Sequence, residues 1–334
     1  MKTYAAYLAK RLLQFVLVVF IGINLTYVIS HATPIDPVEQ TISALTSFGN
    51  TSPEAIETMR QSLRELYGMS GTPVEQYVSF WSRIVVGDFG PSLSAFPTPV
   101  SELILRALPW TIGLLVVATV LAWLLGNLLG GLAGYYRKNR LLKALGIVAM
   151  GLHPMPYYVV AFVLLVVFGF MWPVLPISGG SGIGVDRGFS LDFVYSVFLH
   201  SLLPALSLVL VGLGGWFLGM RALVSNIVTE DYVVYAELGG VDRRRILSSY
   251  VMRNALVPQV TGLAMSLGAI FTGAIITEEV FGYPGIGSLL VDAVHAGDYS
   301  LVLGITSVSI VAVSLAVLVI DLLYPLLDPR VQVE

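Results

Sequence analysis

Long apolar stretches alternate with shorter polar segments along the chain. Each stretch comes near or above the roughly 20 residues that a helix needs to cross a bilayer core. The stretches predict six membrane-spanning helices, at roughly 10–32, 109–134, 143–171, 197–220, 255–277 and 301–324. The first is too long for the apolar region of a signal peptide, so we interpret it as an uncleaved anchor. We therefore expect an all-α integral membrane protein with an anchor at 1–32, an outer helical segment at 33–108 and a five-span core at 109–334.

Composition agrees with a membrane protein and excludes an ordinary soluble domain. Of the 334 residues, 56% are hydrophobic and 12% are charged, whereas about a quarter of a soluble domain is charged. The mean hydropathy is +0.83. There is no cysteine, which excludes disulfides and thiolate metal sites.

The basic residues predict the orientation in the membrane. Clusters such as Arg137–Lys138 and Arg243–Arg245 lie in the short segments after the second and fourth predicted spans. Short loops rich in Lys and Arg stay in the cytoplasm. Both termini are then cytoplasmic, and 33–108 lies outside.

The outer segment contains helix boundary signals. Ser52–Pro53, Thr72–Pro73 and Thr98–Pro99 each place an N-cap residue before a proline, Thr72 and Glu75 have capping-box spacing, and Gly68 and Gly87 are candidate C-caps. These signals predict three short helices. They suit either a purely structural cover or a surface that receives a partner protein.

Small residues recur at every fourth position in three predicted spans. They are Gly126, Gly130 and Gly134 in the second, Gly215 and Gly219 in the fourth, and Ala264 and Gly268 in the fifth. This spacing allows helix backbones to approach closely in lipid, so we expect a tightly packed bundle.

The third predicted span is interrupted by His153-Pro154-Met155-Pro156. Two prolines remove backbone hydrogen bonds and predict a kink. The kinked segment either serves packing alone or lines a translocation path. Residues predicted for the path are His153, Pro154, Pro156, Asn127 and Met265. Asn127 equally suits a hydrogen bond between helices.

Sequence signals for catalysis or cofactor binding are absent. The four histidines are scattered without metal-ligand spacing, and the glycines at 180, 182 and 184 lack the Lys-Ser/Thr of a phosphate loop. We expect no metal, no nucleotide and no nucleic acid on this chain. A membrane hydrolase would have to use Ser288, in a Gly-rich stretch that favours a turn. A stand-alone secondary transporter remains open, although Asp321 is better placed for an interfacial ion pair than for a proton relay.

The segment after the fourth span is organised as two helices joined by glycine. Tyr232, Tyr235, Ala236 and Gly239 follow helical spacing and share one face. Gly239–Gly240 ends this helix, and Asp242 caps a second one that begins with three arginines. A basic anchor on lipid headgroups would explain the arginines, but the helix–turn–helix is better suited to fit a groove on another protein.

This segment, Ala236 to Pro258, resembles the EAA loop of ABC importer permeases, and further motifs resemble the dipeptide/oligopeptide/nickel branch of that family. The matching pieces are Asp36–Pro37, Gly87-Asp88-Phe89-Gly90-Pro91-Ser92, Pro109-Trp110-Thr111, Glu279 to Gly287, Gly297-Asp298-Tyr299 and Asp321…Tyr324…Asp328-Pro329-Arg330. Their order and spacing cover nearly the whole chain. One departure is Gly239, where the family commonly has a basic residue.

The resemblance implies a permease subunit of the bacterial or archaeal inner membrane that is not itself an enzyme. Its partners would be a second homologous permease, two ATPase subunits that bind ATP and Mg, an extracytoplasmic substrate-binding protein and membrane lipid. The loop 221–254 would couple to the ATPases. Its predicted coupling residues are Tyr232, Tyr235, Ala236, Glu237, Gly239, Gly240, Asp242, Arg243, Arg244 and Arg245. Predicted residues of the outer gate and binding-protein side are Phe281, Tyr283, Pro284 and Asp298. Oligopeptides or dipeptides are the first expectation for cargo, with oligosaccharides, nickel or opines as alternatives.

Overall fold

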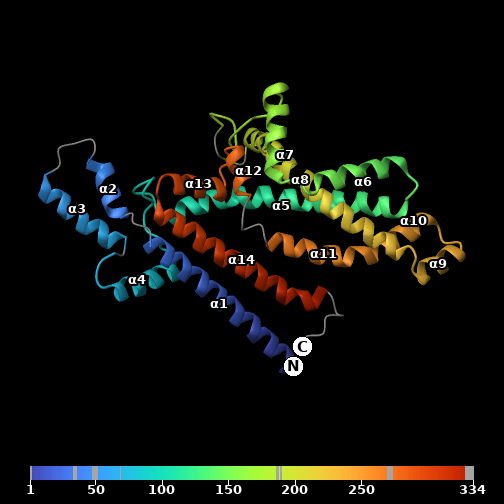
Figure 1. Cartoon of the computed structure of the whole chain (residues 1–334), viewed down its shortest axis with the longest axis horizontal. Helices are drawn as coiled ribbons and strands as arrows, with labels where there is room; N and C mark the ends of the chain where they lie inside the picture. Colours follow the sequence, from blue (N-terminus) through green and yellow to red (C-terminus); the bar gives the residue numbers. More distant parts are fainter. Residues whose placement is uncertain are drawn as a thin grey trace.

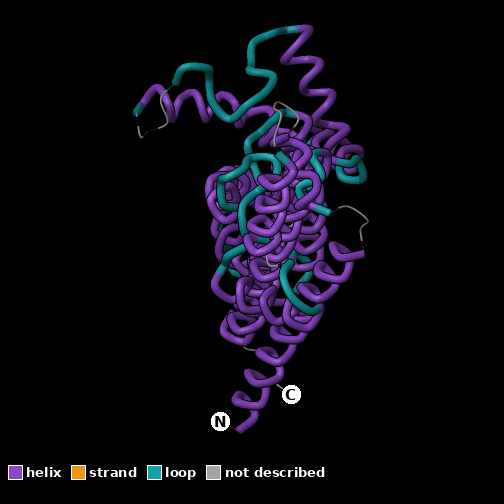
Figure 2. Tube along the Cα trace, turned by 90° about the vertical axis from the view of Figure 1, so that its left-hand side faces the viewer, coloured by secondary structure: helices purple, strands orange, loops and turns teal. Residues whose placement is uncertain are grey.

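The structure is a computed structural model that describes residues 2–32, 36–46, 52–67, 69–185, 188, 190–268 and 274–327. Regular structure in these ranges is helical, apart from one isolated bridge between Pro91 and Pro99. The predicted all-helical class is confirmed. Figure 1 shows the long helices running lengthwise, with α2, α3 and α4 at one end and α9 and α10 at the other. In Figure 2 the helices overlap in one elongated bundle.

Among the described residues, four helices are long and apolar enough to cross a membrane. Their apolar spans are Tyr7–Ile29 in α1 (Lys2–Ala32), Val100–Tyr135 in α5, Leu191–Ile227 in α8, and Tyr299–Leu322 in α14 (Tyr299–Leu327). A bent pair, α6 (Arg140–Leu152) with α7 (Tyr157–Leu164) and the π-helical Leu165–Met171, makes up to five. At the remaining predicted span, 255–277, α11 (Arg253–Gly268) has 16 residues and α12 (Ile275–Val280) follows after the gap in the described residues. The described residues therefore form four or five candidate membrane spans, and the predicted sixth span stays a prediction.

The third predicted span is more sharply broken than the sequence suggested. A continuous kinked helix was expected, but the helix stops at Leu152, restarts at Tyr157 and changes direction by 107°. Pro154 and Pro156 lack N–H donors and disfavour helical geometry in the residues before them. Two prolines one residue apart therefore separate two helices and do more than bend one.

The second predicted span begins earlier than expected. Helix α5 starts at Val100, with Pro99 in the N-cap position, and Pro109 lies inside it. Val100 and Ile104 are buried against Leu301 and Ile305 of α14, so this packing extends the helix beyond its apolar membrane stretch. The predicted capping role of Thr98 is wrong, because no side chain caps this helix.

The other capping signals of the outer segment are confirmed. Helix α3 (Pro53–Leu66) is capped by the Ser52 side chain. Helix α4 (Pro73–Val86) has the full Thr72–Glu75 capping box and ends at Gly87, whose φ of 74° is left-handed. The Thr72 backbone N–H donates to the Glu75 carboxylate, which lowers the pKa of Glu75. Gly68 lies outside the described residues.

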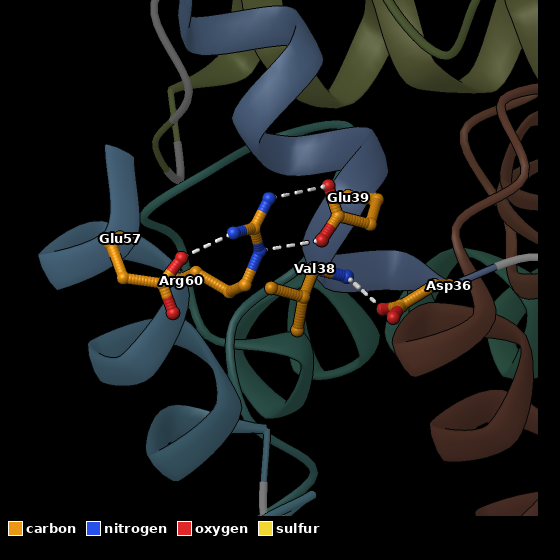
Figure 3. A network of polar contacts seen from close by, with 5 residues as sticks. All are labelled: Asp36, Val38, Glu39, Glu57 and Arg60. Atoms are coloured by element: carbon orange, nitrogen blue, oxygen red, sulfur yellow. Dashed lines mark hydrogen bonds and ion pairs between the residues drawn. The ribbon is translucent and has the colours of Figure 1, made fainter. Parts of the chain in front are cut away.

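Arg60 joins the first two outer helices. Figure 3 shows its guanidinium between Glu57 of α3 and Glu39 of α2 (Pro37–Thr46), with Nε donating to Glu39 Oε1 at 2.7 Å. The Asp36 carboxylate accepts from the Val38 N–H at 2.9 Å at the start of α2. Beneath these contacts Val38, Ile42 and Leu63 form a small apolar core. The outer segment therefore has packing of its own.

Helices α5 and α8 share the most extensive contact among the described helices, and the predicted glycines of α5, though not those of α8, lie in it. A Cβ added to Gly130 would lie 2.4 Å from the Phe217 carbonyl oxygen, and one added to Gly134 would lie 2.8 Å from Val224 Cβ. Glycine is therefore required for the close approach, as the spacing predicted. On α11, Gly268 has a similar role against Ile320 of α14.

A stability prediction follows for Gly130. We expect Gly130→Ala to destabilise the fold by about 1–3 kcal/mol, because the new methyl group would meet backbone and not a flexible side chain. Gly113→Ala on the same helix is the matched control, since a Cβ there has nothing within 4 Å. Thermal unfolding in detergent micelles measures both. Equal melting temperatures for the two variants would contradict the packing argument.

Candidate functional site: the elbow and the outer clasp

Two sites include residues that the sequence singled out. The first, which we call the elbow, consists of α9 (Asp231–Leu238), the turn at 239–242 and α10 (Arg243–Arg245). The Gly240 N–H donates to the Glu237 carbonyl at 3.0 Å and the Val241 N–H to the Ala236 carbonyl at 3.1 Å. Gly240 has φ +74°. This is a Schellman ending, in which the left-handed residue turns the chain and pairs the last carbonyls of the helix.

The second helix of the elbow, α10, begins directly after the turn. The Asp242 carboxylate accepts from the Arg244 N–H at 3.0 Å, which confirms the predicted cap. Only Arg243–Arg245 are α-helical before a π-helical stretch, Ile246–Met252, leads into α11. The second helix therefore runs without a break in the chain into α11 but is irregular at its start.

The elbow is packed firmly on the bundle. Val233 and Ala236 of α9 are buried with Val224 of α8 and Ile246 and Val251 of the π-helical stretch. The Asn254 amide of α11 also donates to the Tyr232 hydroxyl at 3.1 Å. A force on α9 would therefore be transmitted to α8 and α11 together, because close-packed interiors deform little.

The exposed face of the elbow differs from the predicted one. Ala236 points into the core and so cannot contact a partner, although its spacing placed it with Tyr232 and Tyr235. The most exposed apolar side chains of α9 are Tyr235 at 72% and Leu238 at 79%. Leu238 was missed, because only the position of the buried cluster tells which side of α9 faces outward. Glu237, Asp242 and the three arginines are also exposed, and no ion pair forms among them in the described part of the chain.

At the other end of the bundle is the second site, which we call the outer clasp: Thr111 of α5, Glu278 of α12, and the start of α13 (Ile286–His295). Glu278 is fully buried. Its carboxylate accepts from Thr111 Oγ1 at 2.7 Å and from the Gly287 N–H at 2.6 Å. Thr111 Oγ1 in turn accepts from the Ile286 N–H at 2.8 Å. A carboxylate on the first N–H groups of a helix is favoured by the helix dipole, so Glu278 ties α12, α13 and α5 together.

The residues predicted for the outer gate surround this clasp but are mostly covered. Phe281 and Tyr283 are 1% and 3% exposed, and Pro284 is partly buried. The Tyr283 hydroxyl bonds Ser201 Oγ at 3.0 Å, and its ring meets Trp110 edge-on at 5.6 Å. In this structure Phe281 and Tyr283 therefore lie beneath the surface and not on it, because the Phe281 ring packs against α7 and α8 and the Tyr283 ring against α5 and α8.

Asp298, also predicted for the outer side, is fully buried and links two distant segments. It accepts from Ser92 Oγ, from the Ser94 N–H at 3.0 Å and from the Leu301 N–H at 3.0 Å. It therefore caps α14 and holds the turn at 92–94. Its role here is to position these segments, and it presents no free carboxylate to a partner.

The residues predicted for a path are not brought together by any hydrogen bond or ion pair among the described residues. His153 is exposed and packs its ring beside Gly215 of α8. Asn127 is 3% exposed, and its amide donates to the Trp123 carbonyl of its own helix. Met265 is 63% exposed. Pro154 and Pro156 form the break between α6 and α7 described above.

Comparison with known proteins agrees with this architecture. Residues 126–333 match the family described as the binding-protein-dependent transport system inner membrane component. The chain belongs to this family, and the predicted class, that of ABC importer permeases, is confirmed. The family and the apolar helices make it a multi-pass membrane protein, and the relatives described next are permease subunits of transporters.

Several relatives are similar over nearly the full length. The oligopeptide transport system permease protein AppB of Bacillus subtilis is 27% identical over 98% of this chain and 99% of its own length. The probable D,D-dipeptide transport system permease protein DdpB of Escherichia coli is 31% identical over 98% of each chain. The dipeptide transport system permease protein DppB of Lactococcus lactis is 26% identical over 98% of this chain and 99% of its own length.

Proposed function

We propose that this chain is one permease subunit of an ATP-driven importer that takes up oligopeptides or dipeptides. The single observation that carries the proposal is the elbow, an exposed helix–turn–helix fixed to two membrane helices. The names of the similar permeases support peptides as the cargo. In this proposal the elbow is cytoplasmic, both termini are cytoplasmic, and 255–277 completes a sixth span.

The exposed chemistry of the elbow suits a protein partner. Tyr235 and Leu238 offer an apolar knob, and Arg243, Arg244 and Arg245 flank it with positive charge. Aromatic and arginine side chains are favoured at the centres of protein interfaces. Two separate ATPase subunits would bind ATP and Mg and move the elbow when they close. The rigid contacts of α9 with α8 and α11 would carry that movement to the membrane.

In the same proposal the outer clasp lies at the end of the helix bundle opposite the elbow, on the side where the substrate enters. A second, homologous permease would complete the path, and an extracytoplasmic binding protein would deliver the peptide. ATP binding would then favour one of two global arrangements of the helices, which is a shift in population between states. The clasp would keep α5, α12 and α13 together in the arrangement seen here.

Reconstitution tests the proposal and its main rival, a secondary transporter that acts alone. A tagged chain, expressed with its partner genes, is expected to co-purify with a second permease and ATPase subunits. Proteoliposomes that hold the complete set should take up a labelled oligopeptide only with ATP and binding protein, and should leave a labelled oligosaccharide outside. Uptake by this chain without its partners, driven by an ion gradient, would overturn the proposal. Uptake of the oligosaccharide but not of the oligopeptide would overturn the assignment of peptides as the cargo.

A further inference from the structure

Helix α4 has an apolar face that is wider than its contact with the rest of the chain. At about 100° per residue, Tyr77, Phe80, Trp81 and Ile84 point to one side, and Val74, Val78 and Val85 form an adjoining stripe. The stripe is open: these valines are 72%, 61% and 79% exposed. The polar residues Gln76, Ser79 and Arg83 occupy the opposite side. The helix is therefore amphipathic, with half of its apolar face uncovered.

The covered half of that face rests on the first membrane helix. The Trp81 ring stacks on Phe20 at 5.4 Å, and the Phe80 ring meets Tyr27 at 4.6 Å. The Tyr77 hydroxyl donates to Asn24 Oδ1 at 2.7 Å. In Figure 1, α4 lies beside the end of α1 where α2 and α3 are also found, and α1 lies between α4 and α14.

These contacts place α4 at the depth of the bilayer. Phe20 and Asn24 lie inside the apolar span Tyr7–Ile29. Phe20 is nine residues before the end of that span, which at 1.5 Å per residue is about 14 Å along the helix. Tilt of α1 reduces this depth, but Trp81 still lies below the membrane surface. The α1 span is itself lipid-facing, with Leu25 57% and Val28 60% exposed.

We propose that α4 lies in the boundary zone of the lipid bilayer, with Val74, Val78 and Val85 against acyl chains. Helices that bind at this boundary bury an apolar face about 5–10 Å into it and keep a polar face in water. Tryptophan and tyrosine are enriched at the same level, as Trp81 and Tyr77 are here. The α4 stripe then extends the lipid-facing surface of α1, and the helix anchors the outer segment to the membrane.

Site-directed spin labelling tests this placement, and the chain offers a clean background because it has no cysteine. Val78→Cys and Val85→Cys place a label on the stripe, and cysteine is close to valine in size, so the fold should hold. Leu13→Cys, on a residue 59% exposed on α1, serves as the lipid reference. Thr58→Cys, on the exposed surface of α3, serves as the water reference. Collisions with oxygen, which partitions into lipid, are compared with collisions with a water-soluble nickel complex.

The full chain in liposomes should give an oxygen-to-nickel collision ratio at Val78 and Val85 several-fold above that at Thr58 and close to that at Leu13. The ratio should persist when the chain is assembled with its partners. Nickel access at Val78 equal to that at Thr58 would overturn the proposal. Exclusion of both reagents in the assembled transporter would also overturn it, because a protein partner would then cover the stripe.

Discussion

Replacement of Gly240 by valine is expected to leave the protein folded in the membrane but to reduce ATP-driven transport by at least about tenfold, which corresponds to 1.4 kcal/mol of lost coupling. Gly240 has φ +74°, and β-branched residues are strongly disfavoured there. No atom lies within 4 Å of a Cβ built at this position, so the effect comes from backbone conformation and not from a clash. The chain can relieve the strain only by opening the turn, which moves α9 relative to α10. Peptide uptake and ATPase stimulation in proteoliposomes measure the result.

Two further variants make the Gly240 prediction specific. Gly239→Ala should keep most of the transport, because Gly239 has φ −75°, an ordinary value for alanine, and the new Cβ would meet only the Tyr235 carbonyl oxygen closely, at 3.2 Å. Gly240→Asn should retain much of the activity, since asparagine tolerates the left-handed region better than other residues with a side chain. Wild-type transport by the Gly240 valine variant would count against the elbow as a coupling element. An equal loss in the Gly239 alanine variant would mean that the surface of the turn matters more than its conformation.

Removal of the Glu278 carboxylate is expected to have the largest effect on stability. In Glu278→Ala the Gly287 N–H and the Thr111 hydroxyl lose their acceptor inside the protein. A buried donor left unpaired costs about 1–3 kcal/mol, so the variant should lose about 3 kcal/mol and unfold at a clearly lower temperature. Glu278→Gln keeps one acceptor oxygen, so its melting temperature should lie between those of Glu278→Ala and the wild type.

Glu279→Ala is the control for this experiment, because Glu279 is the neighbouring carboxylate and is exposed. Its melting temperature should equal that of the wild type. Thermal unfolding of the purified chain in micelles, with transport measured in parallel, separates a structural effect from a functional one. If Glu278→Ala and Glu279→Ala melt at the same temperature, the outer clasp does not stabilise the fold.

Features governed by neighbouring residues could be predicted from the sequence. The Thr72–Glu75 capping box, the left-handed Gly87 and Gly240, and the Asp242 cap depend on interactions within a few positions of the chain. The close packing of α5 on a neighbour was predictable too, because glycine spacing allows a close approach, although the spacing did not say that the neighbour is α8. Local geometry and composition were sufficient in these cases.

Features that depend on distant partners could not be predicted. Glu278 was passed over because its partner Thr111 is 167 positions away, and the sequence gives no sign that the two meet. Ala236 was assigned to the exposed face because helical spacing defines which residues share a side but not which side is buried. The 107° break at the paired prolines depends on how α6 and α7 pack against α8, and proline alone sets only the place of the break.

The bonds made by Asp298 have a mechanical consequence. One buried carboxylate caps the start of α14 and accepts hydrogen bonds from the turn at 92–94, which lies just before α5. The start of α14 and the turn before α5 therefore share a fixed joint, although 206 positions separate Ser92 from Asp298. Motion in the transport cycle must bypass this joint, so we expect the helices to swing about it as about a fixed pivot and to travel farthest at the opposite end, where the elbow is.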